Sequence, residues 1–167
     1  SKSDINGNKT EYTKAEDVDA FLLSDNIQQE IRPVNPYSRP GDKISKVTAI
    51  VVHYVGNPGT TAEQNRSYFN NLAELKNAYA SSHYVVGLQG EIIQCVPLDE
   101  IAYASNNRNY DTISIECCHQ DAEGRFTGDT YNSLVRLVAA LCRTYGLNPE
   151  TDVIRHYDVT GKLCPIY

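Results

Sequence analysis

The chain has 167 residues, of which 15 are basic and 21 are acidic, giving a formal net charge of −6. With 41% hydrophobic and 22% charged residues, its composition is that of an ordinary globular protein and excludes dominant disorder and fibrous or repeat architectures. The acidic balance argues against a nucleic-acid partner, because binding to phosphates needs clustered Lys and Arg. No apolar run approaches the roughly 18 residues that a membrane span requires.

Residues 1–46 form the first of two expected parts, an N-terminal arm. A capping-box pattern that starts at Thr13 predicts a short helix with Phe21 and Leu22 on its apolar face. Three prolines within residues 32–41 exclude a helix in that stretch. We expect this stretch to be an ordered connector that lies across the body of the protein, with a plain linker as the alternative.

The second expected part, residues 47–167, contains the core and any catalytic site. Residues 47–55 are β-branched and almost continuously apolar, which is typical of a strand buried on both faces. A second capping-box pattern, Thr60 with Glu63, begins a helix predicted over residues 61–76.

The remaining elements alternate between strands and one long helix. Two apolar runs, 83–88 and 91–96, flank a Gln-Gly turn and predict a hairpin, and residues 112–118 predict another strand. A long helix ending before Gly146 is predicted by an apolar stripe of Tyr131, Leu134, Val135, Val138, Leu141, Cys142 and Tyr145. With a last short strand over 152–156, the order predicts an α/β fold: a mixed central β-sheet flanked by helices, in a single domain with an N-terminal extension.

Two histidines stand at predicted strand ends, where α/β sheets place their sites. His53 lies near the end of the most buried strand, and His156 ends the last strand shortly before Cys164. Two imidazoles and a thiolate form a suitable zinc set that leaves the fourth tetrahedral position to water. The alternative is two histidines bonded to backbone and one ordinary cysteine. His119 follows a strand into a polar loop, and we expect it to be solvated.

Glu116 is a carboxylate inside an apolar strand. Alternation along residues 112–118 places Ser114, Glu116 and Cys118 on the face opposite two isoleucines. Such a carboxylate is costly unless it is paired, bound to a metal or facing a cleft, which makes Glu116 a candidate general base beside a zinc-bound water. The alternative is an edge-strand glutamate that faces solvent.

Lys162 lies two residues before Cys164 in a short Gly-containing segment. A cation at this place could stabilise the oxyanion of a tetrahedral intermediate. The alternative is a solvated turn lysine.

Three short blocks resemble the zinc-dependent N-acetylmuramoyl-L-alanine amidases of type 2. That family includes amidase-type phage lysozymes and endolysins and is related to peptidoglycan recognition proteins. The blocks are Val-Val-His at 51–53, Ser-Ile-Glu at 114–116, and His156 with Lys-Leu-Cys-Pro at 162–165. The likeness extends from Val47 to Pro165, and its last block is the most specific.

The resemblance implies a role for each matching residue. It implies His53, His156 and Cys164 as the ligands of one zinc ion, Glu116 as the catalytic base, and Lys162 as the residue that polarises the scissile carbonyl. The implied reaction is hydrolysis, by a zinc-activated water, of the amide between the lactyl group of N-acetylmuramic acid and L-alanine of the stem peptide.

The implied partner is peptidoglycan, so the chain is expected to be a bacteriolytic, cell-wall-degrading hydrolase. A wall substrate implies a secreted, extracellular or cell-wall-associated protein, or one delivered by phage lysis. The sequence contains no Met, even at position 1, and we expect any export signal or anchor to lie outside it. We also expect a monomer.

Two departures from the family pattern concern the substrate groove. Some phage members have a functional Tyr before the histidine that His83 resembles, and here that place is Ser82. The family's His-Ala-Gly after the third strand is replaced by residues 103–107, where Asn106 and Asn107 are candidates for binding substrate. His83 is either a hydrogen-bonded structural histidine or a further residue of this groove.

With Cys164 assigned to the metal, four cysteines remain. They are Cys95, Cys117, Cys118 and Cys142, and we expect buried free thiols, with a Cys95–Cys118 disulfide as the alternative.

Two other functions compete with the amidase. One is a peptidoglycan-binding module on the same fold without chemistry, for which loss of the third metal ligand would be the discriminating feature. The other is a Cys–His thiol hydrolase or acyltransferase, which a thiol alkylator rather than a chelator would inhibit.

Overall fold

The computed structural model describes residues 2–3, 9–10, 18–55, 58–67, 80–105, 108–123 and 125–155. The expected capping box at Thr13 lies outside these residues. So do five candidate site residues: His156, Lys162, Cys164, Asn106 and Asn107. Near the N-terminus, β1 (Lys2–Ser3) pairs with β2 (Lys9–Thr10) in a separate two-stranded sheet.

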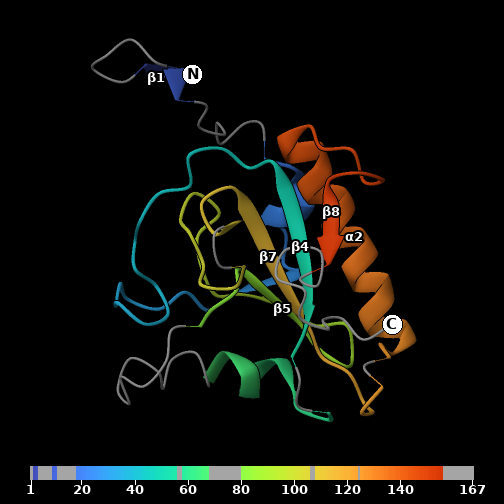
Figure 1. Cartoon of the computed structure of the whole chain (residues 1–167). Helices are drawn as coiled ribbons and strands as arrows, with labels where there is room; N and C mark the ends of the chain where they lie inside the picture. Colours follow the sequence, from blue (N-terminus) through green and yellow to red (C-terminus); the bar gives the residue numbers. More distant parts are fainter. Residues whose placement is uncertain are drawn as a thin grey trace.

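A six-stranded sheet forms the centre of the fold (Figure 1). Its strands in spatial order are β3 (Ile27–Gln29), β6 (Ile92–Gln94), β5 (Tyr84–Val86), β7 (Thr112–Cys117), β4 (Ala49–Tyr54) and β8 (Val153–Arg155). β5 and β6 are antiparallel, and the other neighbouring pairs of this sheet are parallel. The expected mixed α/β sheet is confirmed.

β4 and β7 are interior strands because their residues are apolar on both faces. β7 lies between β5 and β4, and β4 lies between β7 and β8. Ile50, Val51, Ile113 and Ile115 have no exposed surface. The continuous apolar runs in the sequence therefore identified two interior strands of the sheet.

β5 and β6 form the expected hairpin, joined by a turn over residues 87–91. The Gly87 N–H donates to the Glu91 carbonyl (2.8 Å), which closes the turn. Gly90 has a φ of +81°, and a Cβ atom there would lie 3.0 Å from the Asp129 carbonyl oxygen. Glycine is required because this turn packs closely against the start of the following helix.

That helix, α2 (Gly128–Tyr145), lies along one side of the sheet, next to β8 (Figure 1). The Thr127 hydroxyl caps its N-terminus by accepting from the Thr130 N–H (3.0 Å), and Gly146 ends it in a left-handed conformation, as predicted. Among the described residues, no helix combines the length and the apolar character needed to cross a membrane.

The buried face of α2 is rotated from the predicted stripe. Tyr131 and Val135 are 57% and 49% exposed, so placing them in the stripe was wrong. The small Thr130 and Ala140 are fully buried instead. The stripe was predicted from the large apolar residues alone. Packing of α2 against the sheet also favours small residues at positions where the helix backbone comes close to the strands.

Residues 62–67 form the described part of the helix predicted over 61–76. Its capping box is Thr61 with Gln64, and the prediction of Thr60 with Glu63 was wrong by one residue. The Gln64 N–H donates to Thr61 Oγ1 (3.0 Å), and the Thr61 N–H donates to Gln64 Oε1 (2.9 Å). Both pairs fit the capping-box pattern, and only the structure distinguishes them.

The sheet has an apolar cluster on each face. The larger cluster includes Ile50 and Ile115 together with the buried residues of α2. The smaller cluster includes Val85 and Cys118 together with Ala62 of the helical residues 62–67. In Figure 1, residues 62–67 (green) lie well apart from α2 (orange). The two faces of the sheet are thus covered by different elements.

The described part of the N-terminal arm packs against the larger cluster. A short 3-10 helix, η2 (Ala20–Leu23), buries Leu22, and Ile27 of β3 and Ile44 are also buried there. The sequence analysis did not predict β3, because a three-residue strand with one buried side chain is too short to show periodicity.

Residues 32–41 form the expected ordered connector. They contain no helix, and the Asn35 N–H donates to the Arg39 carbonyl (2.7 Å) across a tight turn. Arg39 Nε and Nη2 donate to the two carboxylate oxygens of Glu100 at 3.0 and 2.8 Å. A bidentate pair of this kind fixes geometry as well as charge, so the connector is attached to the body.

We predict that Arg39→Ala destabilises the fold by about 3 kcal/mol, because it leaves a buried carboxylate without its partner. The Glu100 side chain in this pair is only 6% exposed. Urea unfolding followed by circular dichroism measures the change. Lys43→Ala is the matched control, since the Lys43–Asp99 pair is more than half exposed on both sides and should cost less than about 1 kcal/mol. Equal losses in the two variants would contradict the prediction.

Candidate active site

His53 and Glu116 are neighbours on adjacent strands. β4 pairs with β7 in parallel register, and His53 is the partner of Glu116 in that register. Register partners in a sheet lie about 4.8 Å apart at the backbone and direct their side chains to the same face. The sheet therefore brings together an imidazole and a carboxylate that the sequence separates by 62 intervening residues.

This pair lies on the face of the sheet opposite α2. Ile50 and Val52 contact the cluster on the α2 side, and His53 follows them with the opposite orientation. His53 is 2% exposed, whereas Glu116 is partly accessible. An enclosed imidazole beside a more accessible carboxylate is an arrangement suited to ligand binding and proton transfer.

The alternative of Glu116 as an edge-strand residue is wrong. β7 is an interior strand, and Glu116 has a register partner on each side, His53 on β4 and Val85 on β5. Val85 is fully buried in the smaller apolar cluster. A carboxylate between an imidazole and a buried valine is expensive to desolvate, which favours a functional reason for its presence.

The expected zinc set is only partly within the described residues. β8 ends at Arg155, one residue before His156. The last register pair between β8 and β4 is Arg155 with Val52. His156 and Cys164 themselves lie outside the described residues. Within the described ranges, no three His, Cys, Asp or Glu side chains form a group that could hold a metal ion.

His83 has the contacts of a structural histidine. The Ser114 N–H donates to His83 Nδ1 (3.0 Å), so the hydrogen of the neutral ring is on Nε2, which donates to the Glu100 carbonyl (2.7 Å). The side chain is fully buried. Of the two roles considered for His83, these contacts favour the structural one over contact with a substrate.

His119 is not solvated, contrary to expectation. It is 1% exposed, and its ring packs edge-on against Tyr54 with the centroids 5.3 Å apart. Its Nδ1 lies 2.7 Å from the Asp121 carbonyl oxygen. The sequence placed His119 in a polar loop, but the fold buries the ring against Tyr54 at the end of β4.

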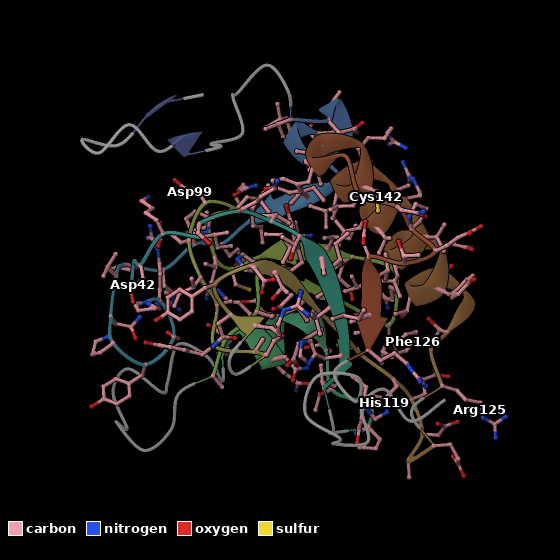
Figure 2. All side chains as sticks on the ribbon, turned by 45° about the horizontal axis from the view of Figure 1, so that its top comes forward. Asp42, Asp99, His119, Arg125, Phe126 and Cys142 are labelled. Carbon is pink, nitrogen blue, oxygen red and sulfur yellow. The ribbon has the colours of Figure 1, made fainter. Side chains whose placement is uncertain are left out.

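The four described cysteines are buried, and none of them forms a disulfide bond, as expected. Burial raises the pKa of Cys95 and of Cys118 to about 12. Cys142 lies on α2, well separated from the segment that contains His119 (Figure 2). Thiols that stay protonated at neutral pH are poor nucleophiles, so these residues do not favour a thiol hydrolase.

Ser105 is a neighbour of His53 that sequence reasoning did not single out. Its Oγ lies 3.5 Å from His53 Nε2, and both side chains are buried. The residue belongs to the segment 103–107, in which the sequence pointed to Asn106 and Asn107 but not to Ser105. A serine has no periodicity or motif of its own, and only the fold brings it to a histidine that precedes it by 52 residues.

Comparison with known proteins gives a consistent group of relatives. The model of the N-acetylmuramoyl-L-alanine amidase family matches residues 43–166. The chain is similar to N-acetylmuramoyl-L-alanine amidase BlyA of Bacillus subtilis (strain 168), with 37% identity over 153 residues. It is also similar to N-acetylmuramoyl-L-alanine amidase CwlL of Bacillus licheniformis, with 37% identity over 145 residues.

These relatives are longer than this chain. The two alignments cover 80% and 79% of this chain but only 40% and 39% of the relatives, so the chain spans less than half of their length. Among solved structures, a mutant endolysin from Bacillus subtilis has a similar fold, with a TM-score of 0.70 and 28% identity. That likeness covers 83% of this chain and 88% of the endolysin chain.

We predict that the native state loses stability in acid because of His83. Burial lowers the pKa of His83 from 6.5 to about 4. Between these two values the unfolded chain binds a proton that the native state does not, so the stabilisation is complete above pH 6.5 and declines as the pH falls. The loss should amount to about 3 kcal/mol by pH 4.

Urea unfolding at several pH values between 7 and 4 measures this dependence. His83→Gln retains a donor and an acceptor but does not titrate, so its unfolding curve should be flatter with pH over this interval. Parallel pH curves for the two proteins would show that His83 is not the group responsible.

Proposed function

The chain belongs to the N-acetylmuramoyl-L-alanine amidase family, and we propose that it hydrolyses the amide between the lactyl group of N-acetylmuramic acid and L-alanine of the peptidoglycan stem peptide. The observation that supports this most is the register pair of His53 and Glu116 on the face of the sheet opposite α2. This pair places a potential metal ligand, His53, beside a potential base, Glu116, on the same face of the sheet.

His53, His156 and Cys164 would hold one zinc ion. The donor chemistry fits, because two neutral imidazoles and one thiolate are preferred ligands of zinc and leave a position for water. The position of His53 also fits, since its side chain is enclosed near the end of an interior strand and Glu116 is its register partner on the neighbouring strand. When bound, zinc lowers the pKa of a coordinated water and polarises a carbonyl group.

Glu116 would move the proton in this reaction. Its carboxylate accepts a proton from the attacking water as the new carbon–oxygen bond forms at the scissile carbonyl. It then gives the proton to the alanine nitrogen as the carbon–nitrogen bond breaks. The second proton of the water passes from the new carboxylic acid to the released amine. The products are a lactyl carboxylate and a stem peptide with an L-alanine ammonium group, so atoms and charge balance without another reactant.

Lys162 would stabilise the negative charge that develops on the carbonyl oxygen. An ammonium group is suited to this task because its charge is fully present at neutral pH. Asn106 and Asn107 are proposed to bind the sugar or peptide part of the substrate. Both amide side chains can donate and accept hydrogen bonds, as glycan hydroxyl and peptide groups require.

Several properties follow from a wall substrate. We propose that the protein acts outside the cytoplasm, as a secreted or cell-wall-associated enzyme or as one delivered during phage lysis. We also propose that it acts as a monomer. Residues 1–46 would form an arm on the catalytic part, 47–167, and the described part of that arm contacts the larger apolar cluster.

A non-catalytic peptidoglycan-binding module on the same fold is the remaining competitor. The presence of Cys164 and Glu116 favours the enzyme, because a binding module requires neither a third metal ligand nor a base. Digestion of purified muropeptides followed by mass spectrometry distinguishes the two. The amidase releases free stem peptides that begin with L-alanine, whereas the module leaves the muropeptides intact.

We predict that Glu116→Gln lowers kcat by about 10²- to 10⁴-fold, because the amide cannot accept the proton of the attacking water. The fold should persist, since the two side chains have nearly the same shape. The same muropeptide assay measures the rate. Glu123→Gln, which changes an exposed carboxylate, is the matched control and should leave the rate unchanged. A Glu116→Gln variant with the rate of the wild type would exclude this role.

We predict that the purified protein contains one zinc ion per chain and that Cys164→Ser binds zinc much more weakly. A hydroxyl is a poorer zinc ligand than a thiolate. Elemental analysis after gel filtration measures the metal content. Cys142→Ala, which removes a buried thiol from α2, should retain zinc. Full zinc content in Cys164→Ser, or chelator-resistant hydrolysis, would contradict the proposed ligand set.

A further inference from the structure

The loop that contains Ser105 is held by atoms other than the Ser105 hydroxyl. Asn109 Oδ1 accepts from the backbone N–H groups of Ala104 (3.2 Å) and Ser105 (2.7 Å). The Arg108 N–H donates to the Ser105 carbonyl (3.0 Å). Both backbone groups of Ser105 are therefore satisfied without its side chain, and the loop conformation does not depend on the hydroxyl.

The base of the loop is fixed to the strand that contains Glu116. Arg108 Nε donates to the Asp111 carboxylate at 2.8 Å, and the Thr112 hydroxyl donates to the Arg108 carbonyl at 2.6 Å. Thr112 is the first residue of β7. Ser105 is thus held in a defined place relative to β7, and through the pairing of β7 with β4 also relative to His53.

The Ser105 hydroxyl itself faces His53. It is completely buried, and within the described part of the chain its only hydrogen-bonding partner is His53 Nε2 at 3.5 Å. Burying a hydroxyl is costly, and an alanine would satisfy the loop equally well. The hydroxyl is therefore explained by its contact with the His53 imidazole and not by the conformation of the loop.

We propose that Ser105 is a positioning residue for His53 in metal binding, an inference that rests on the proposed zinc amidase function. The contact between Ser105 Oγ and Nε2 holds the ring by one nitrogen, so that Nδ1 would be the nitrogen that binds the metal. The hydroxyl thereby restricts rotation of the ring. A partner on the second ring nitrogen is the general means by which proteins orient histidine ligands.

Ser105→Ala tests the proposal by zinc affinity, measured in competition with a chromogenic chelator on the full chain. We expect the dissociation constant for zinc to rise by about 10- to 100-fold. At saturating zinc we expect kcat on muropeptides to fall with KM unchanged, because the hydroxyl is buried and does not touch the substrate. Urea unfolding of both proteins shows whether a loss of stability accompanies the change.

Two Asn109 variants test the same geometry without altering Ser105. Asn109→Asp retains the oxygen acceptor for both loop N–H groups, so zinc affinity should stay near that of the wild type. Asn109→Leu removes the acceptor, so Ser105 loses its fixed place and zinc affinity should fall as in Ser105→Ala. Equal zinc affinities in the two Asn109 variants would count against the proposal.

Ser133→Ala is the matched control. The Ser133 hydroxyl donates to the Gly90 carbonyl at 2.6 Å, and Ser133 lies on α2, on the other side of the sheet from His53. This variant should lose stability without any change in zinc affinity. A merely structural Ser105 would behave in the same way.

The outcomes separate this inference from the proposed function. A wild-type chain that binds zinc and releases stem peptides, with an unchanged zinc affinity in Ser105→Ala, would overturn the inference and leave the function intact. A wild-type chain that binds no zinc would overturn both.

Discussion

The parallel pairing of β4 with β7 is the constraint on which the candidate site depends. Six consecutive register pairs join the two strands, from Ala49 with Thr112 to Tyr54 with Cys117. Because side chains alternate along a strand, this register decides at once which residues enter the core and which meet on the other face. A slip by one residue would move Glu116 into the α2 side of the sheet and separate it from His53.

The polar face of the sheet is supported by a continuous chain of contacts that begins in the N-terminal arm. Arg39 binds the Glu100 carboxylate, the Glu100 carbonyl accepts from His83, and His83 accepts from the Ser114 backbone. Ser114 precedes Glu116 by two residues on the same face of β7. Each member is buried or partly buried, so this chain of contacts links the connector to β7 next to the candidate base.

The difference between the two faces of the sheet explains how the fold accommodates the candidate catalytic carboxylate. On one face, isoleucines of β4 and β7 pack against α2 in the larger cluster. On the other face, the apolar cover is smaller and leaves Glu116 partly accessible. Placing the Glu116 carboxylate and the His53 imidazole on interior strands costs stability, and the apolar cluster on the α2 side of the sheet offsets this loss.

The sequence by itself determined strands β4 and β7, the hairpin, and the long helix with Gly146 at its C-terminus, because apolar periodicity and capping residues act over a few neighbouring positions. It also indicated His53 and Glu116 as candidates, since a histidine near a buried strand end and a glutamate in an apolar run are local anomalies. Only the tertiary structure decided that these two residues are register partners, that β3 completes the sheet, that His119 is covered by Tyr54, and that Ser105 faces His53. These outcomes depend on strand order and register, which are set by contacts between residues far apart in the chain and leave no periodic trace in the sequence.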